Sequence, residues 1–117
     1  MSRLLHIADR EEWAAAAQAG QYRPASLEEE GFIHCSLPEQ IVPVADASYR
    51  ARHGLVLLVV DPAVVPAELR FEACYEGGQE FPHIYGSLPV EAVVQVLEFE
   101  PGQDGRFALP ATLDRGD

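Results

Sequence analysis

Residues 55–60 read Leu-Val-Leu-Leu-Val-Val, a run with an apolar side chain at every position. A short apolar run of this kind is typical of a strand that is buried on both faces. Asp61-Pro62 follows at once and predicts a short helical turn after the strand, because proline suits the first position of a helix. We therefore expect residues 55–60 to be a central strand of the core.

The chain before this strand predicts a strand over residues 3–8 and then a helix. Asp9 is a suitable N-cap, Glu12 stands three residues later as in a capping box, and Gly20 is a suitable C-terminal stop. Residues 22–30 contain a proline and an acidic run, so we expect a surface connection that can include a helical turn.

A second strand and a second helix are predicted over residues 31–49. Residues 31–35 favour a strand, and the Ser36-Leu-Pro-Glu39 sequence after it repeats the capping-box pattern. An apolar stripe with helical spacing continues to residue 49. Pro43 lies inside this stripe, where it should kink the helix or delay its start.

Strands dominate the second half of the chain. Residues 69–75 alternate as in a half-buried strand, Gly77-Gly78 predicts a turn, and residues 93–99 predict another apolar strand. Glycine, aspartate and proline accumulate from Pro101 onward. We expect one α+β domain over residues 1–100, with two helices near the N-terminus, and a partly loose C-terminal extension over residues 101–117.

Composition limits the classes of partner. The 117-residue chain carries 19 acidic and 8 basic residues, a formal charge of −11, and every basic residue is an arginine. This charge disfavours non-specific nucleic-acid binding and docking on anionic membranes, whereas a small-molecule ligand such as a nucleotide or metabolite is compatible with it. The N-terminal residues have no signal-peptide core and the longest apolar run is too short to cross a bilayer, so we expect a cytoplasmic protein.

Candidate site residues are polar side chains inside strand-like segments. His6, His34 and His83 are each flanked by large apolar residues. Side chains alternate along a strand, so Ser36 can share a face with His34, and Tyr85 can share one with His83. We expect these five residues to line one cleft, because strands are rigid elements on which polar groups can converge.

Three alternatives stay open for these residues. Each histidine can be a half-buried packing residue bonded to backbone. Three imidazoles could also bind zinc in a metal-dependent hydrolase, but no short ligand spacing supports this, and we assign no metal site. Cys35 adjoins His34, but neighbouring strand residues point to opposite faces; Cys35 and Cys74 are therefore expected to be reduced thiols, Cys35 in the core.

Two motifs carry a resemblance to a known family. Gly-Phe-Ile-His-Cys-Ser at residues 31–36 and Phe-Pro-His-Ile-Tyr-Gly at residues 81–86, with the opening Leu-His-Ile-Ala and Trp13, resemble an uncharacterised bacterial family, domain of unknown function 952. The resemblance extends over residues 3–99. Ser87 stands where the family pattern has proline.

The order of elements is also similar to the ADP-ribosyltransferase-like fold, a split-sheet architecture that holds NAD in a cleft. This similarity implies that His6, His34 and Ser36 bind the cofactor and that His83 or Tyr85 occupies the catalytic position. His6 would orient ribose hydroxyls, His34 would pack on the nicotinamide, and His83 would bond the reacting ribose. Transferases of this fold usually have a glutamate at that position, and Glu80 lies near it but outside the match.

The resulting function hypothesis is binding of NAD or a related nucleotide in a histidine-lined cleft. Weak ADP-ribosyl transfer or glycohydrolase activity could accompany binding. We expect such an activity to be weak because the glutamate that is usual at the catalytic position is missing. The alternative is a non-catalytic module that binds a metabolite or a peptide, and the missing glutamate supports it.

Overall fold

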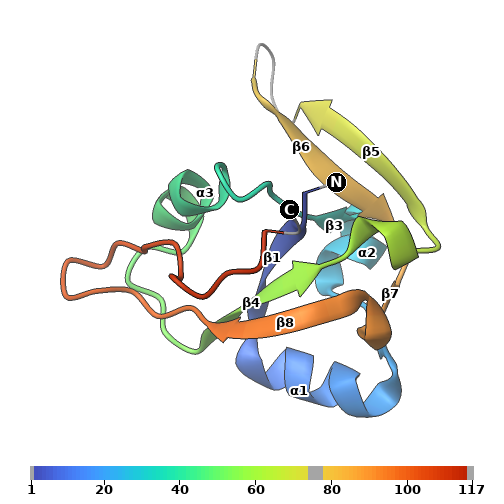
Figure 1. Ribbon diagram of the computed structural model, residues 1–117, viewed down its shortest axis with the longest axis horizontal. Coiled ribbons are helices and arrows are strands. Elements are labelled where there is room, and N and C mark those ends of the chain that lie inside the picture. The colour runs from blue at the N-terminus through green and yellow to red at the C-terminus, as the bar shows by residue number, and fades with distance from the viewer. Residues whose placement is uncertain (1, 74–77, 116–117) are drawn as a thin grey trace.

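The apolar run at residues 55–60 forms strand β4 (Leu55–Val60), the central strand of a three-stranded antiparallel sheet (Figure 1). It lies between β1 (Leu4–Asp9) and β8 (Val93–Glu98), and all six of its residues are buried. The prediction of a central buried strand is therefore confirmed. The computed structural model describes residues 2–73 and 78–115, so Cys74 and Gly77, which the sequence analysis discussed, lie outside the described residues.

Two smaller antiparallel sheets complete the β structure. One has the order β3–β6–β5 and the other pairs β2 with β7. Their bounds are Ile33–His34 (β3), Glu80–Tyr85 (β6), Glu68–Ala73 (β5), Gln21–Tyr22 (β2) and Leu88–Pro89 (β7). A single bridge joins the β1–β4–β8 sheet to the β3–β6–β5 sheet. In this bridge, the backbones of Leu5 and Ser36 exchange two hydrogen bonds of 2.8 Å each.

Helix α1 (Arg10–Ala19) begins and ends as predicted. The Asp9 carboxylate accepts hydrogen bonds from the backbone N–H groups of Glu11 and Glu12, which satisfies two of the free donors at this helix end. Gly20 ends the helix with a φ of 91°, a left-handed conformation that glycine adopts readily.

The second predicted helix starts later than its capping signal indicates. Ser36 does not cap it, because its backbone is committed to the bridge with Leu5. Helix α3 runs from Ile41 to Ser48, so Pro43 lies in its first turn, where a missing N–H group costs no helical hydrogen bond. The expected delay by proline is confirmed. A third helix, α2 (Ala25–Glu30), forms where only a helical turn was expected.

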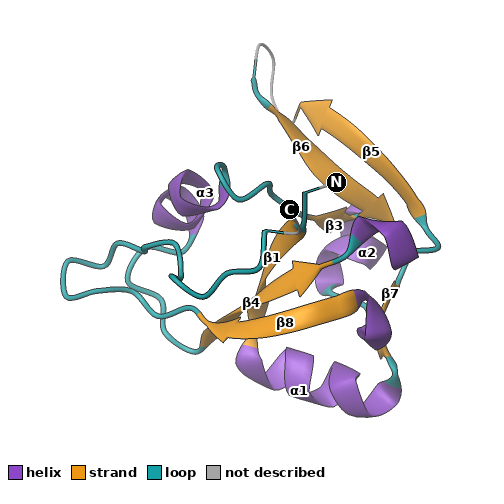
Figure 2. Cartoon of the chain, viewed as in Figure 1, coloured by secondary structure: helices purple, strands orange, loops and turns teal. Residues whose placement is uncertain are grey.

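The first sheet forms a layer between two cores, with α1 on one face and α3 on the other (Figure 2). Val56, Leu58 and Val60 face the α1 side. The intervening Leu55, Leu57 and Val59 face the α3 side. Alternation along β4 thus supplies both cores from a single strand. Short 3₁₀ helices at Pro62–Val64 and Val90–Ala92 flank the sheet, the first being the helical turn predicted after Asp61.

Residues 101–115 have irregular backbone but pack on the α3 side of the sheet. Phe107 is 5% exposed, stacks on Phe99 at a centroid distance of 4.8 Å, and its N–H group donates to Asp46. Leu109 and Leu113 contact the same core. This segment is part of the folded core through these apolar side chains.

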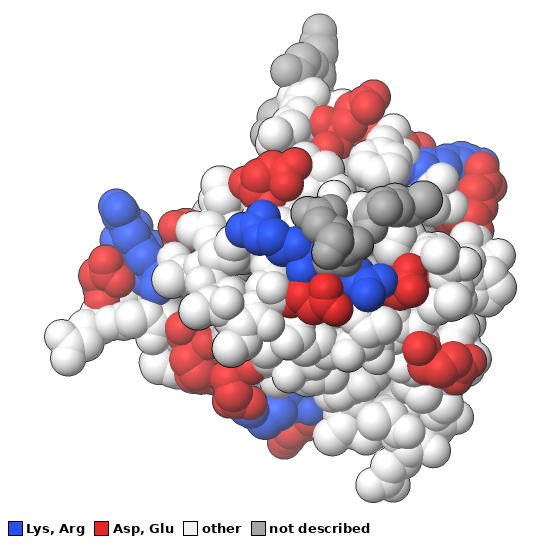
Figure 3. Space-filling model, viewed as in Figure 1, with Lys and Arg blue, Asp and Glu red and all other residues white. Residues whose placement is uncertain are grey.

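The surface follows from strand position and charge. Strand β5 is an edge strand, and the Phe71 residue on it is 47% exposed. This exposed fraction is larger than the sequence alternation predicted for the apolar face of a half-buried strand. Figure 3 shows the arginines of the visible face beside acidic side chains rather than in a basic patch. Among the helices of the described residues, none is both long and apolar enough to cross a membrane.

Candidate functional site

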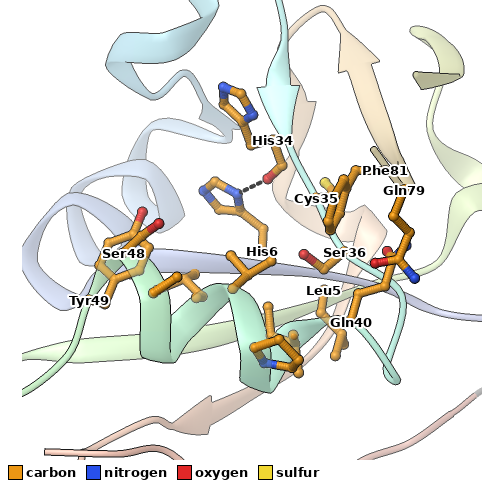
Figure 4. A pocket seen from close by; sticks show the side chains of 15 residues that line it. Leu5, His6, His34, Cys35, Ser36, Gln40, Ser48, Tyr49, Gln79 and Phe81 are labelled. Carbon is orange, nitrogen blue, oxygen red and sulfur yellow. Dashed lines mark hydrogen bonds between the residues drawn. The ribbon is translucent and has the colours of Figure 1, made fainter. Parts of the chain in front are cut away.

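A pocket of about 380 Å³ lies between α3, strand β1 and the segment that links β3 to α3 (Figure 4). Most of its wall is apolar, and the polar groups in it come from histidine, serine, glutamine and tyrosine. The residues that carry those polar groups are His6, His34, Ser36, Gln40, Ser48, Tyr49 and Gln79. A mostly apolar wall with a few convergent polar groups, at this volume, is typical of a small-molecule site.

His6 lies in the wall of the pocket with both ring nitrogens engaged by the protein. Nδ1 is 2.5 Å from the carbonyl oxygen of His34, and Nε2 is 2.8 Å from the hydroxyl of Tyr22. A carbonyl can only accept, so Nδ1 carries the proton and Nε2 accepts from Tyr22. Burial lowers the pKa of His6 to about 4, which keeps the ring neutral at physiological pH. A ligand hydroxyl would have to displace one of these partners to bond His6.

Ser36 is one of the polar residues of the pocket whose side chain has no hydrogen-bond partner among the described residues, together with Ser48, Tyr49 and Gln79. The residue is only 4% exposed, and among the described residues no side-chain hydrogen bond reaches its hydroxyl. Gln40, beside it, is satisfied: its side-chain oxygen accepts from the N–H group of Leu37 and its amide donates to the carbonyl of Glu80. Since the residue lines the pocket and its hydroxyl has no protein partner there, the Ser36 hydroxyl is a candidate contact for a bound molecule.

His34 connects the pocket with a cluster of rings on the second sheet. Its Nε2 lies 2.9 Å from a carboxylate oxygen of Glu30 and its side chain is exposed. Its ring meets the ring of His83 edge to face at a centroid distance of 5.3 Å, and Phe32 packs against both. These contacts follow from the register of the sheet, in which His34 pairs with His83.

His83 and Tyr85 bond to one carboxylate, that of Glu72 on β5. The Tyr85 hydroxyl donates to it at 2.5 Å, and Nδ1 of His83 lies 2.8 Å from the same oxygen. These two bonds hold the pKa of Glu72 below its usual range, and the bond from Tyr85 raises the pKa of that phenol. Phe32 stacks on the His83 ring at 4.1 Å, and the guanidinium of Arg70 lies over the ring of Tyr85. His83 is 2% exposed as a result.

The structure thus brings His6, His34 and Ser36 to one pocket, and places His83 and Tyr85 beyond His34 in the ring cluster. Sequence reasoning missed Gln40, which lines the pocket, and Tyr22, which bonds His6 from the core. It also missed Phe32 and Glu72, which complete the ring cluster. Alternation with apolar neighbours predicts which face of a strand a side chain occupies, but it does not predict which residue that side chain contacts. The contact depends on the register between strands, which neither strand encodes alone.

A second hollow of about 410 Å³ adjoins the pocket and shares His6, His34, Ser48 and Tyr49 with it. Charged side chains line this hollow at the start of α1 and beyond the end of α3. They are Asp9, Glu12 and Arg52. Arg52 lies 3.9 Å from the Asp9 carboxylate and over the ring of Tyr49.

The three histidines do not form a metal centre with any other ligands that the structure describes. Within residues 2–73 and 78–115, no group of three His, Cys, Asp or Glu side chains is placed to hold a metal ion. His6 has already used both nitrogens, which leaves it no lone pair for a metal.

Cys35 lines the pocket but its thiol is a poor nucleophile. The residue is buried, and burial raises the pKa of the thiol to about 12. We expect less than ~1% of Cys35 to be thiolate at pH 8, since the pKa lies about four units higher. Iodoacetamide at pH 8 should therefore leave Cys35 unmodified in the native protein and alkylate it in urea, as read by mass spectrometry of the peptide that contains it. Alkylation of native Cys35 at the rate of the unfolded chain would contradict this.

Comparison with solved structures finds close relatives of the whole fold. Two crystal structures of protein CC0527 from Caulobacter crescentus, one of them a double mutant, align with TM-scores of 0.82 and 0.81. A solution NMR structure of CC0527 aligns with a TM-score of 0.78. Each relative is 34% identical; the crystal structures cover 92% of this chain and 94% of that chain, and the NMR structure 89% and 90%. No curated protein matches the chain.

The family described as "Protein of unknown function (DUF952)" matches residues 7–96, a span that contains both histidine motifs and most of the pocket wall. The span is well over half of the chain, and the fold of the described residues is α+β with three helices and antiparallel sheets. The chain belongs to the DUF952 family.

Proposed function

We propose that this DUF952 protein binds a small ring-bearing metabolite of the nucleotide class, with its heteroaromatic ring in the pocket between α3 and β1. The observation that carries the proposal is the Ser36 hydroxyl, which belongs to a residue in the wall of a mostly apolar pocket and makes no side-chain hydrogen bond to another described residue. A ring fits an apolar wall, and a polar substituent on that ring would bond Ser36. The resemblance of the predicted element order to the ADP-ribosyltransferase-like fold is the reason to test NAD first.

Binding is favoured over catalysis by the use that His83 and Tyr85 make of their polar atoms. Both bond to Glu72, and His83 is buried behind Phe32 rather than in the pocket wall. In the pocket itself, His6 is neutral and fully bonded. The exposed ring of His34 is the group best placed to pack on a ligand ring.

Calorimetric titration and thermal shift with NAD, ADP-ribose and nicotinamide test the proposal. Saturable heat with a rise in melting temperature is the expected result for at least one of the three. Absence of both at millimolar ligand would end it. A separate assay for free nicotinamide distinguishes an enzyme from a binder, since steady release that is lost in His83→Ala would establish catalysis.

Removing the Ser36 hydroxyl should weaken the ligand without weakening the protein. We expect Ser36→Ala to lower affinity about tenfold through one lost hydrogen bond, with a free energy of unfolding unchanged or raised by up to ~1 kcal/mol. A hydroxyl without a protein partner contributes no hydrogen bond to the folded state, so its removal should not lower the free energy of unfolding. Calorimetry and urea unfolding measure the two effects.

Ser87→Ala is the matched control, because the Ser87 hydroxyl bonds Gln21 away from the pocket. It should leave affinity unchanged. Equal affinity of Ser36→Ala and wild type would remove the observation on which the proposal depends.

A further inference from the structure

The two adjoining hollows differ in charge, and the difference bears on the ligand. Among the described residues that line the pocket, none is Asp, Glu, Lys or Arg. The adjoining hollow, through which a longer ligand would extend, is lined by two carboxylates, those of Asp9 and Glu12, and one guanidinium, that of Arg52.

The arginine at this hollow is already engaged. Arg52 faces the Asp9 carboxylate at 3.9 Å and the ring of Tyr49 at 5.4 Å. Three other arginines are paired elsewhere: Arg3 with Asp61, Arg10 with Glu98, and Arg70 with Glu68. Among the described arginines, Arg52 is the one that lines either hollow. The pocket and the adjoining hollow together form the groove in which a ligand would lie. A phosphate in the hollow part of this groove would meet the guanidinium of Arg52, which Asp9 already shares, and two carboxylates. The protein as a whole has a formal charge of −11.

Backbone donors do not compensate for the missing cations. The start of α3 lines the pocket, but its first turn contains Pro43, which has no N–H group to offer an anion. Within residues 2–73 and 78–115, the glycines with left-handed backbone are at residues 20, 31, 54 and 105, and none of them lines either hollow. The wall therefore has no glycine-rich phosphate cradle of the kind that nucleotide sites use.

We propose that the groove selects unphosphorylated, neutral or cationic ring compounds of the nucleoside class over their phosphorylated forms. The inference rests on the proposed function and names the ligand class of the same site. The ring enters the neutral pocket and a hydroxyl-bearing or cationic end lies beside Asp9 and Glu12. A phosphorylated ligand such as NAD would bind through its ring, and its phosphates would add no affinity.

Matched ligand pairs that differ by one phosphate test this selectivity on the full chain. Calorimetry should compare nicotinamide riboside with its 5′-monophosphate, and adenosine with its 5′-monophosphate. We expect the nucleoside of the better-bound pair to bind about tenfold more tightly, with a gap that shrinks as salt is added. Equal or tighter binding of the monophosphate would overturn the inference while leaving the proposed function intact. Failure of both pairs to bind would overturn the inference alone if NAD, ADP-ribose or nicotinamide still binds, and would end the proposed function as well if none of these three binds.

Glu12→Gln removes one carboxylate from the groove with little change in shape. It should reduce the ratio of affinities between nucleoside and monophosphate about threefold, chiefly because the monophosphate binds more tightly. Glu11→Gln is the control, because Glu11 lies on the same helix turn but lines neither hollow. A gap that stays the same in Glu12→Gln, or that narrows equally in Glu11→Gln, would overturn the role given to the groove carboxylates.

Discussion

Lowering the pH from 7 to 4 should cost the folded protein about 3 kcal/mol through His6 alone, because its pKa of about 4 in the folded state lies well below the ordinary 6.5. In this interval the unfolded chain takes up a proton on His6 and the folded protein does not. The unfolded state therefore binds more protons, and stability falls as the pH falls. The share of the free energy of unfolding that depends on a neutral His6 is fully present above pH 6.5 and is lost by about pH 4.

The physical cause is the closed environment of the ring. A proton on Nε2 would meet the Tyr22 hydroxyl on a ring that is only 8% exposed, so little water could solvate the charge. Urea unfolding at half-unit steps from pH 7 to 4 measures the slope. In His6→Gln the amide cannot titrate, so the difference between the two curves should isolate the His6 contribution from that of the carboxylates.

His53→Gln is the matched control for this measurement. His53 is exposed and its Nδ1 lies 2.8 Å from Glu100, so its removal leaves the buried ring unchanged. The control removes the bond that lowers the pKa of Glu100 but keeps the His6 contribution, so it should still lose much more stability between pH 7 and 4 than His6→Gln does. A His6→Gln variant with the same loss of stability between pH 7 and 4 as wild type would show that His6 is not held neutral in the folded protein.

Local signals in the sequence predicted the parts of the fold that local chemistry decides. The apolar run at 55–60 predicted a doubly buried strand, Asp9 and Gly20 predicted the ends of α1, and Pro43 predicted the late start of α3. Each depends on neighbours within a few residues. The capping role of Ser36 was wrong because a partner 31 positions earlier, Leu5, takes its backbone into a bridge.

The candidate site depends more on long-range contacts, and it was harder to predict for that reason. Alternation correctly indicated that His34 and Ser36 reach one pocket, and that His83 and Tyr85 share a face. It could not indicate that Tyr22 closes on His6, or that Glu72 lies between His83 and Tyr85. Those contacts depend on the positions of whole elements after packing, which no short window of sequence carries.

The C-terminal segment was predicted as a partly loose extension because glycine, aspartate and proline accumulate in it and no periodic pattern is present. Its apolar residues are few, and their burial comes from contact with a distant sheet rather than from a helix or strand of their own. Phe107 meets Phe99 at the end of β8, and Leu109 and Leu113 follow it onto the same face. Such a segment has no local signature, so its role in stability must be measured.

Phe107→Ala should lower the free energy of unfolding by about 3–5 kcal/mol, the usual cost of truncating a buried phenylalanine. The ring stacks on Phe99, so its loss leaves a cavity between the C-terminal segment and the sheet. Phe71→Ala is the matched control, since that ring is 47% exposed on an edge strand and should cost less than ~1 kcal/mol. Urea unfolding of both variants at pH 7 gives the comparison. Equal, small effects would mean that residues 101–115 contribute little to the core, and that the domain is complete near residue 100.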